Sequence, residues 1–205
     1  MNIFLLGATG GTGRALIEQG LARGHVITAL VRSPQKITVR NPALVVHGGD
    51  VTNAEQIARV LVAQDVVIST LGHRDLKATP LIAASAKCVI QAMQAGGMRR
   101  LLMLSAALLF PDVGPPVLTP IISYILRHGL NDSREMEKLV MESGLDWTIA
   151  RPPRLTNGPK TESYQIADGS LPGKARSISR ADVAHFFLNE GEHPEHVRKI
   201  VGLCY

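Results

Sequence analysis

The chain has 205 residues, a formal net charge of +5, 45% hydrophobic residues and 4% aromatic residues. This length and apolar content suit one globular domain over residues 1–205 with a sizeable core. No apolar run is long enough to span a bilayer and the basic residues do not cluster, so we expect neither membrane insertion nor nucleic-acid binding. The first residues lead directly into a predicted strand without a charged leader, so we expect a cytoplasmic protein.

The two cysteines, Cys88 and Cys204, fall inside predicted elements that are far apart in the sequence. This arrangement favours two core thiols over a disulfide or a pair of metal ligands, and we expect no metal site. The modest positive charge suits a phosphate-rich small molecule as the binding partner.

An apolar run at residues 1–6 predicts a buried first strand. A glycine-rich segment follows at residues 7–13, and apolar residues at helical spacing then predict a helix over residues 12–24. A glycine-rich turn between a strand and a helix is typical of a dinucleotide-binding fold. The spacing here is Gly-x-x-Gly-x-x-Gly, and the alternative is a glycine-rich connector of some other α/β fold.

Three glycines of this segment are expected to have different structural roles. Gly7 permits a tight turn off the strand, Gly10 lets the backbone approach a diphosphate, and Gly13 lets the helix pack closely on the strand. The start of the helix then offers unpaired N–H groups and a partial positive charge to the phosphates. The cofactor contacts predicted here are Gly7, Thr9, Gly10, Gly11, Thr12 and Gly13.

The rest of the chain alternates between short apolar runs and helical patterns, which predicts a Rossmann-type doubly wound parallel sheet with helices on both faces. Strands are predicted over residues 25–31, 43–47, 65–70, 100–104, 145–150 and 199–203, and helices over residues 53–62, 80–95, 131–143 and 180–190. A proline-rich connection at residues 106–120 and an irregular segment at residues 151–175 lie between the later elements. The segments near residues 106–130 and 151–178 are expected on the substrate side, and the apolar stretch 117–126 is either a lid or a contact surface.

The residues after the second strand indicate which cofactor fits. An NAD site usually has an acidic residue there to bind the ribose 2′-hydroxyl, whereas this chain has Arg32 and Ser33, with Lys36 one turn on. Because an arginine suits a 2′-phosphate, we expect NADPH to be preferred over NADH. The alternative is a solvated surface arginine.

Further candidate residues lie at other predicted strand ends, where the ligand crevice of an open α/β sheet forms. Asp50 and Val51 are the expected adenine contact, and Asp50 could also cap the helix that starts near Asn53. Gly72 lets the backbone pass close to the cofactor ribose. Ser105 either places a hydroxyl against the nicotinamide or simply ends its strand in a turn.

Several segments together carry a family resemblance. They are Gly7-Ala8-Thr9-Gly10-Gly11-Thr12-Gly13, Gly49-Asp50-Val51, Leu71-Gly72-His73-Arg74, residues 105–110, residues 142–153 and residues 179–184. They resemble the atypical short-chain dehydrogenase/reductase superfamily and, within it, the biliverdin reductase B / flavin reductase group, over nearly the whole chain. The resemblance implies that Leu71, Gly72 and Arg74 lie along the cofactor, that Pro152 lies beside the nicotinamide, and that Ser105 is the active-site serine.

The chain departs from this superfamily at the proton donor. Typical members carry Tyr-x-x-x-Lys, and counting back from Ser143-Gly144-Leu145 places these two positions at Gly129 and Ser133. Tyr124 is nearby, but no lysine lies four residues after it. The flavin reductase group has one histidine near position 133 and another after its proline pair, where this chain has Arg154. Carbonyl reduction of the usual kind is therefore not expected.

A flavin delocalises the charge that hydride transfer creates, so it needs no strong side-chain acid. The sequence therefore predicts an NADPH-dependent reductase of a flavin or similar flat conjugated acceptor, such as FMN, FAD, a quinone or a linear tetrapyrrole. Ser105, as a hydrogen-bond donor, and Arg154, which would offset negative charge, are the predicted catalytic residues. The alternative is a non-catalytic NADP(H)-binding redox sensor or regulator. We expect a monomer or a weak homodimer.

Overall fold

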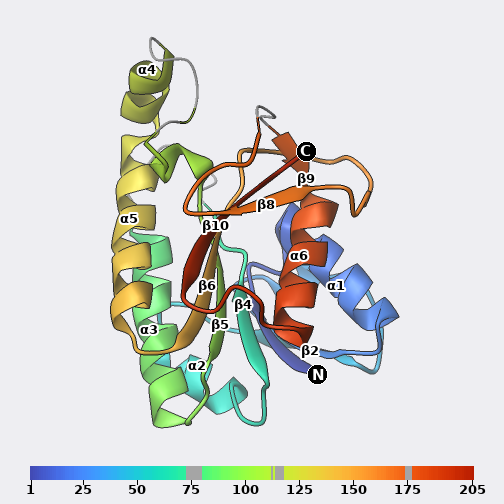
Figure 1. The fold of residues 1–205 in the computed structure, drawn as a ribbon. Coiled ribbons are helices and arrows are strands. Elements are labelled where there is room, and N and C mark those ends of the chain that lie inside the picture. Colours follow the sequence, from blue (N-terminus) through green and yellow to red (C-terminus); the bar gives the residue numbers. More distant parts are fainter. Residues whose placement is uncertain (73–79, 112, 114–117, 174–176) are drawn as a thin grey trace.

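The computed structural model describes residues 1–72, 80–111, 113, 118–173 and 177–205. Its main-sheet strands are β1 Asn2–Leu6, β2 Val26–Val31, β3 Leu44–Gly48, β4 Val66–Ser69, β5 Arg100–Leu104, β6 Asp146–Arg151, β8 Gln165–Asp168 and β10 Lys199–Cys204. They lie in the order β3-β2-β1-β4-β5-β6-β10-β8 (Figure 1). The pairs from β3 to β10 are parallel, and β8 joins the edge antiparallel to β10. The predicted doubly wound Rossmann-type sheet is confirmed.

Helices cover both faces of this sheet (Figure 1). They are α1 Gly11–Ala22, α2 Ala54–Val60, α3 Leu81–Ala95, α4 Leu118–Ile125, α5 Arg127–Glu142 and α6 Arg180–Glu192, with short 3-10 helices η1 Pro34–Lys36 and η2 Ala107–Leu109. In β1, Ile3 and Leu5 pack into the core under α1 and α6, whereas Phe4 and Leu6 pack into the core under α2, α3 and α5. A strand that is buried on both faces has a continuous run of apolar residues. These strands could therefore be predicted from the sequence.

In the later part of the chain, several helices and strands differ from those predicted from the sequence. Helix α5 begins at Arg127 rather than residue 131, and α4 occupies part of the stretch that was predicted as a connection. The predicted irregular segment contains β8 and also β7 Arg154–Thr156, which pairs with β9 Ser177–Ser179 in a separate sheet. Strands of three or four residues are too short to show a clear alternation, and their partners lie far away in the sequence. In α4, Pro120 lies in the first turn, where proline is tolerated.

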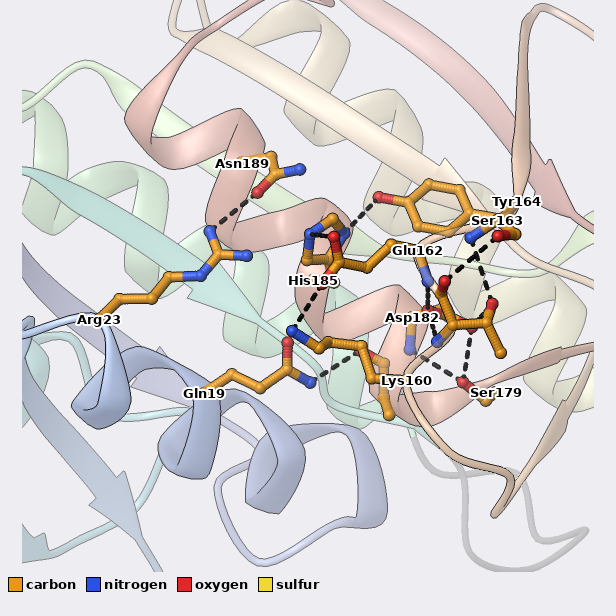
Figure 2. Close-up of polar contacts among 12 residues, drawn as sticks. Gln19, Arg23, Lys160, Glu162, Ser163, Tyr164, Ser179, Asp182, His185 and Asn189 are labelled. Atoms are coloured by element: carbon orange, nitrogen blue, oxygen red, sulfur yellow. Dashed lines mark hydrogen bonds and ion pairs between the residues drawn. The ribbon is translucent and has the colours of Figure 1, made fainter.

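Helix α6 is anchored by a buried carboxylate at its start (Figure 2). Asp182 accepts hydrogen bonds from the backbone N–H groups of Thr161 at 2.8 Å and Glu162 at 2.9 Å, and from the hydroxyl of Tyr205 at 2.7 Å. Burial by itself would raise the pKa of Asp182, but these hydrogen bonds bring that pKa below its ordinary value. The Ser179 side chain caps the same helix end. Asp182 therefore ties a distant loop and the last residue to α6.

Helices α3 and α5 are joined by a second buried carboxylate. Asp132 of α5 accepts from the backbone N–H groups of Ile82 and Ala83, both at 2.9 Å, in the first turn of α3. Pro80 precedes α3 and provides no side-chain cap, so Asp132 supplies it from a neighbouring helix. In the described part of the chain, no helix is long and apolar enough to cross a membrane.

Candidate functional site

A cavity of about 790 Å³ opens at the carboxyl ends of β1, β2, β4 and β5. Its volume lies in the range of small-molecule and cofactor sites. The lining residues are Gly7, Thr9, Gly10, Gly11, Thr12, Leu30, Val31, Arg32, Ser33, Lys36, Val51, Thr70, Leu71, Gly72, Leu81, Leu104, Leu155 and Arg180. Most of the residues predicted to contact a cofactor are therefore brought together around one cavity.

The glycine-rich loop fits the diphosphate of a dinucleotide. Gly7 has a φ of +83°, and a Cβ there would lie 2.6 Å from the carbonyl carbon of Thr70. A Cβ at Gly13 would lie 2.3 Å from the Gly7 oxygen, so this glycine allows α1 to pack on the loop. Gly10 precedes α1 and gives it no side-chain cap. The N–H groups of the first turn of α1 therefore remain suited to an anion.

Positive side chains lie at the end of the cavity formed by β2. Arg32, Ser33 and Lys36 all line it. Asp50 does not, whereas its neighbour Val51 does. The backbone N–H and the hydroxyl of Thr52 hold the pKa of Asp50 below its ordinary value, and Arg32 acts in the same direction.

The predicted alternative role of Asp50 as a helix cap is wrong. The side chain of Asn53 caps α2 by accepting from the backbone N–H of Gln56 at 3.0 Å. Asp50 instead accepts from the N–H of Thr52 at 2.9 Å, which closes its own turn. An adenine contact by Asp50 stays a prediction.

Ser105 lies just past the cavity, since Leu104 lines it and Ser105 follows Leu104 at the end of β5. The Ser105 hydroxyl donates to Glu137 Oε1 of α5 at 2.6 Å. Arg151, the last residue of β6, donates to both oxygens of the same carboxylate, at 2.9 Å and 2.5 Å. The one hydrogen of the Ser105 hydroxyl is therefore directed at Glu137 in this structure, and a contact between Ser105 and a ligand stays a prediction.

Two further predicted residues, Arg154 and Pro152, do not line the cavity. Arg154 is exposed on β7, and the next residue, Leu155, lines the cavity instead. Pro152 is buried, and its carbonyl accepts from the backbone N–H of Ala107 at 3.0 Å. Arg74 lies outside the described residues. The structure thus does not bring Arg154 and Ser105 together on the cavity wall.

Sequence reasoning missed Arg180 at the start of α6. Its side chain covers Gly11 so closely that a Cβ there would lie 2.5 Å from Arg180 Cδ. Its Nη1 atom donates to the carbonyl of Leu155 at 3.2 Å and to Asn157 Oδ1 at 2.8 Å, which holds the guanidinium at the cavity. The motif at residues 179–184 contained Arg180, but only the fold brings it against the glycine-rich loop.

A second cavity of about 490 Å³ opens beside the C-terminal half of α6. Among its lining side chains, Arg23 pairs with Glu192 at 2.8 Å and Glu190 with His196 at 2.5 Å. No group of three or more potential metal ligands occurs in the part of the chain that the structure describes. The first cavity is therefore the candidate site.

Comparison with known proteins agrees with this geometry. A family model described as NAD(P)H-binding matches residues 7–194. The uncharacterized protein YwnB of Bacillus subtilis is 27% identical, over 96% of this chain and 94% of that protein. An uncharacterized chloroplastic protein of Arabidopsis thaliana is 29% identical over 78% of this chain, and the chain spans only 61% of that relative's length.

One solved structure of similar length is a provisionally named NADH-flavin reductase from Streptococcus pneumoniae. It is 25% identical, has a TM-score of 0.77, and the match covers 99% of this chain and 98% of that one. The structure thus has a glycine-rich loop before a helix, a cavity of cofactor size, and a family match over residues 7–194. The chain belongs to the NAD(P)H-binding family, as the resemblance to atypical short-chain dehydrogenases/reductases predicted.

Proposed function

We propose that this protein is an NADPH-dependent reductase that transfers hydride to a flavin or a similar flat conjugated acceptor. The observation that carries the proposal is the single cavity that joins the glycine-rich loop, the cationic end at Arg32 and Lys36, and the apolar walls Leu104 and Leu155. NADPH would supply the hydride when it is bound. The chain's own residues would bind its phosphates at one end and hold a flat ring between apolar side chains at the other.

The tyrosines of the chain support an acceptor that needs no side-chain acid. The sequence contains three, Tyr124, Tyr164 and Tyr205. Tyr124 is 68% exposed on α4. Tyr164 bonds to His185 at 2.9 Å, and Tyr205 donates to Asp182, both beside α6. None of the three lines the candidate cavity. Simple carbonyl substrates, which need a positioned acid, are therefore disfavoured.

The comparison with the Streptococcus pneumoniae protein supports the same acceptor class by its name, and the cationic side chains after β2 favour NADPH over NADH. The test is NADPH oxidation in the presence of FMN, FAD, a quinone or a simple aldehyde, followed by the absorbance of the reduced nicotinamide. We expect turnover with at least one conjugated acceptor and little with the aldehyde.

Tyr124→Phe should leave this turnover unchanged, because the Tyr124 hydroxyl lies on an exposed helix away from the cavity. Measurement of kcat/KM for NADPH with the best acceptor checks this. An inactive Tyr124→Phe protein would mean that a displaced tyrosine is the acid. Clear NADPH binding without turnover on any acceptor would favour the redox-sensor alternative.

A further inference from the structure

A polar cluster lies at the carboxyl ends of β5 and β6. Ser105 follows β5 and Arg151 ends β6, and the parallel register that pairs Leu104 with Ala150 sets these two residues side by side. Glu137 reaches both from α5. We name Ser105, Glu137 and Arg151 the serine relay.

The ion pair of the relay determines the direction of the serine hydrogen bond. Arg151 holds Glu137 through Nε and Nη2, one to each carboxylate oxygen. The Arg151 guanidinium also lies 4.6 Å from the centroid of the Phe110 ring, which holds it in place. A carboxylate held by an arginine in this way only accepts hydrogen bonds. The Ser105 hydroxyl is therefore the donor in its 2.6 Å bond to Glu137.

A serine hydroxyl has one hydrogen and two lone pairs. With its hydrogen directed at Glu137, Ser105 has only lone pairs to offer a ligand. We propose that the serine relay makes Ser105 a hydrogen-bond acceptor for an amide, imide or lactam N–H of a bound ring, with Glu137 as the positioning residue. The proposal rests on the reductase function, in which the reacting rings lie against Leu104 and its neighbour Ser105.

Two sources could present that N–H group. The nicotinamide carries a carboxamide, and flavins and linear tetrapyrroles carry imide or lactam N–H groups, whereas an oxidised quinone has only carbonyl acceptors. If Ser105 binds the acceptor, the relay selects flavins or tetrapyrroles over quinones. If it binds the carboxamide, the relay orients the nicotinamide.

The first arm of the test uses cofactor binding and needs no turnover. NADPH and its 3-acetylpyridine analogue, in which a methyl group replaces the carboxamide nitrogen, are titrated by fluorescence. If Ser105 accepts from the carboxamide, the wild-type protein should prefer NADPH by roughly 3- to 10-fold, as expected for one neutral hydrogen bond. Ser105→Ala should remove that preference.

The second arm uses turnover with FMN and N3-methyl FMN, which lacks the imide hydrogen. If Ser105 accepts from the acceptor, the wild-type protein should prefer FMN in kcat/KM by roughly 3- to 10-fold. Ser105→Ala should again remove the preference. A Ser105→Ala protein that keeps the wild-type preference in both arms overturns the proposal.

The positioning role of Glu137 needs a variant that still folds. Removal of Glu137 alone would leave Arg151 buried without its partner, so Glu137→Met and Arg151→Met are combined, which replaces the ion pair by apolar side chains of similar size. The serine hydrogen is then free, Ser105 can act as donor or acceptor, and the preference for the N–H ligand should fall. The ligand preference of this double variant is measured in whichever assay, cofactor binding or turnover, responds to Ser105→Ala.

A matched control is the buried pair of Arg100 and Glu190, at the opposite end of β5. Its side chains are 10% and 4% exposed, against 13% and 4% for Arg151 and Glu137. Arg100→Met with Glu190→Met should leave the ligand preference unchanged. An equal loss of preference in this control overturns the proposal, because it would reflect general destabilisation. Absence of all turnover contradicts the reductase function, while the binding arm still tests the relay.

Discussion

At the scale of single residues, the glycines of the loop between β1 and α1 meet different surroundings. A Cβ at Gly13 would overlap backbone atoms of Gly7 and Ala8, at 2.3 Å and 2.8 Å. A Cβ at Gly10 would meet only the Gly7 oxygen, at 3.2 Å, and Gly10 lines the cavity. The lack of a side chain therefore serves packing at Gly13, whereas at Gly10 it leaves the cavity wall open.

Gly10→Val should abolish binding of NADPH and NADH while the melting temperature stays close to that of the wild-type protein, because the side chain would occupy the place of the diphosphate. Gly13→Ala is the contrasting variant, and overpacking against the loop should destabilise it by about 1–3 kcal/mol. Nucleotide titration and thermal unfolding measure the two effects. Normal nucleotide binding by Gly10→Val would show that the cofactor does not lie on this loop.

Arg32→Ala should weaken NADPH binding by about tenfold or more and leave NADH binding nearly unchanged, because a charge-assisted hydrogen bond contributes about 1.5–3 kcal/mol. Fluorescence titration with both nucleotides is the measurement. Arg40→Ala removes an exposed arginine that does not line the cavity and should change neither affinity. Equal affinities of the wild-type protein for NADPH and NADH would refute the assigned preference.

At the scale of elements, α5 connects the core to the site through one buried face. Asp132, Ser133, Met136, Glu137 and Val140 are all buried on this helix. Asp132 caps α3, and Glu137, five residues later, belongs to the serine relay. The position of Glu137 thus depends on how α5 packs against α3 and the sheet.

Asp132→Ala should lower the free energy of unfolding by about 1–3 kcal/mol, because two backbone N–H groups at the start of α3 would lose a buried acceptor. Urea unfolding measures this loss. Glu135→Ala removes an exposed carboxylate from the same helix and should change stability little. If both variants lose stability equally, the bonds from Asp132 to α3 are not what stabilises this helix pair.

At the scale of the whole molecule, the cavity draws on both halves of the doubly wound sheet. The glycine-rich loop and Arg32 come from the β1–β3 half, whereas Leu104, Leu155 and Arg180 come from later parts of the chain. Helix α6 links them, since Arg180 covers Gly11 from its first turn. The hydrogen bonds around Asp182 hold that end of α6 in place (Figure 2).

Asp182 should make the stability of the protein depend on acid pH. Its pKa is lowered in the folded state, so as the pH falls the unfolded chain takes up a proton first, near its ordinary value of about 3.9. The stabilisation is therefore present at neutral pH and lost as the pH falls through the lowered folded pKa. Urea unfolding of wild-type and Asp182→Asn proteins from neutral pH to about pH 3 should show a difference that shrinks in acid.

The control for this series is Glu135→Gln, an exposed carboxylate outside the Asp182 cluster. Its unfolding free energy should follow that of the wild-type protein across the whole range. A difference between wild-type and Asp182→Asn proteins that does not change with pH would contradict the role of the charged carboxylate.

The parallel strands of the main sheet, most of the helices and the glycine-rich loop could be predicted from the sequence alone. These features are local: buried strands are continuous apolar runs, helices repeat their apolar residues, and residues 7–13 lie within one turn of the chain. The same local reading located Arg32 and Ser33 directly after a strand, at the edge where an open α/β sheet binds its ligand.

The side chains that meet at the other end of the cavity could not be predicted from the sequence, because they come from distant elements. Ser105, Glu137 and Arg151 are brought together by the register of β5 with β6 and by the packing of α5, and Arg180 reaches Gly11 because α6 packs beside α1. Strand β8 likewise depends on its pairing with β10, which lies more than thirty residues later in the sequence. The spacing of apolar residues indicates which face of a helix or strand is buried. Contacts between distant elements depend on how those buried faces pack against one another.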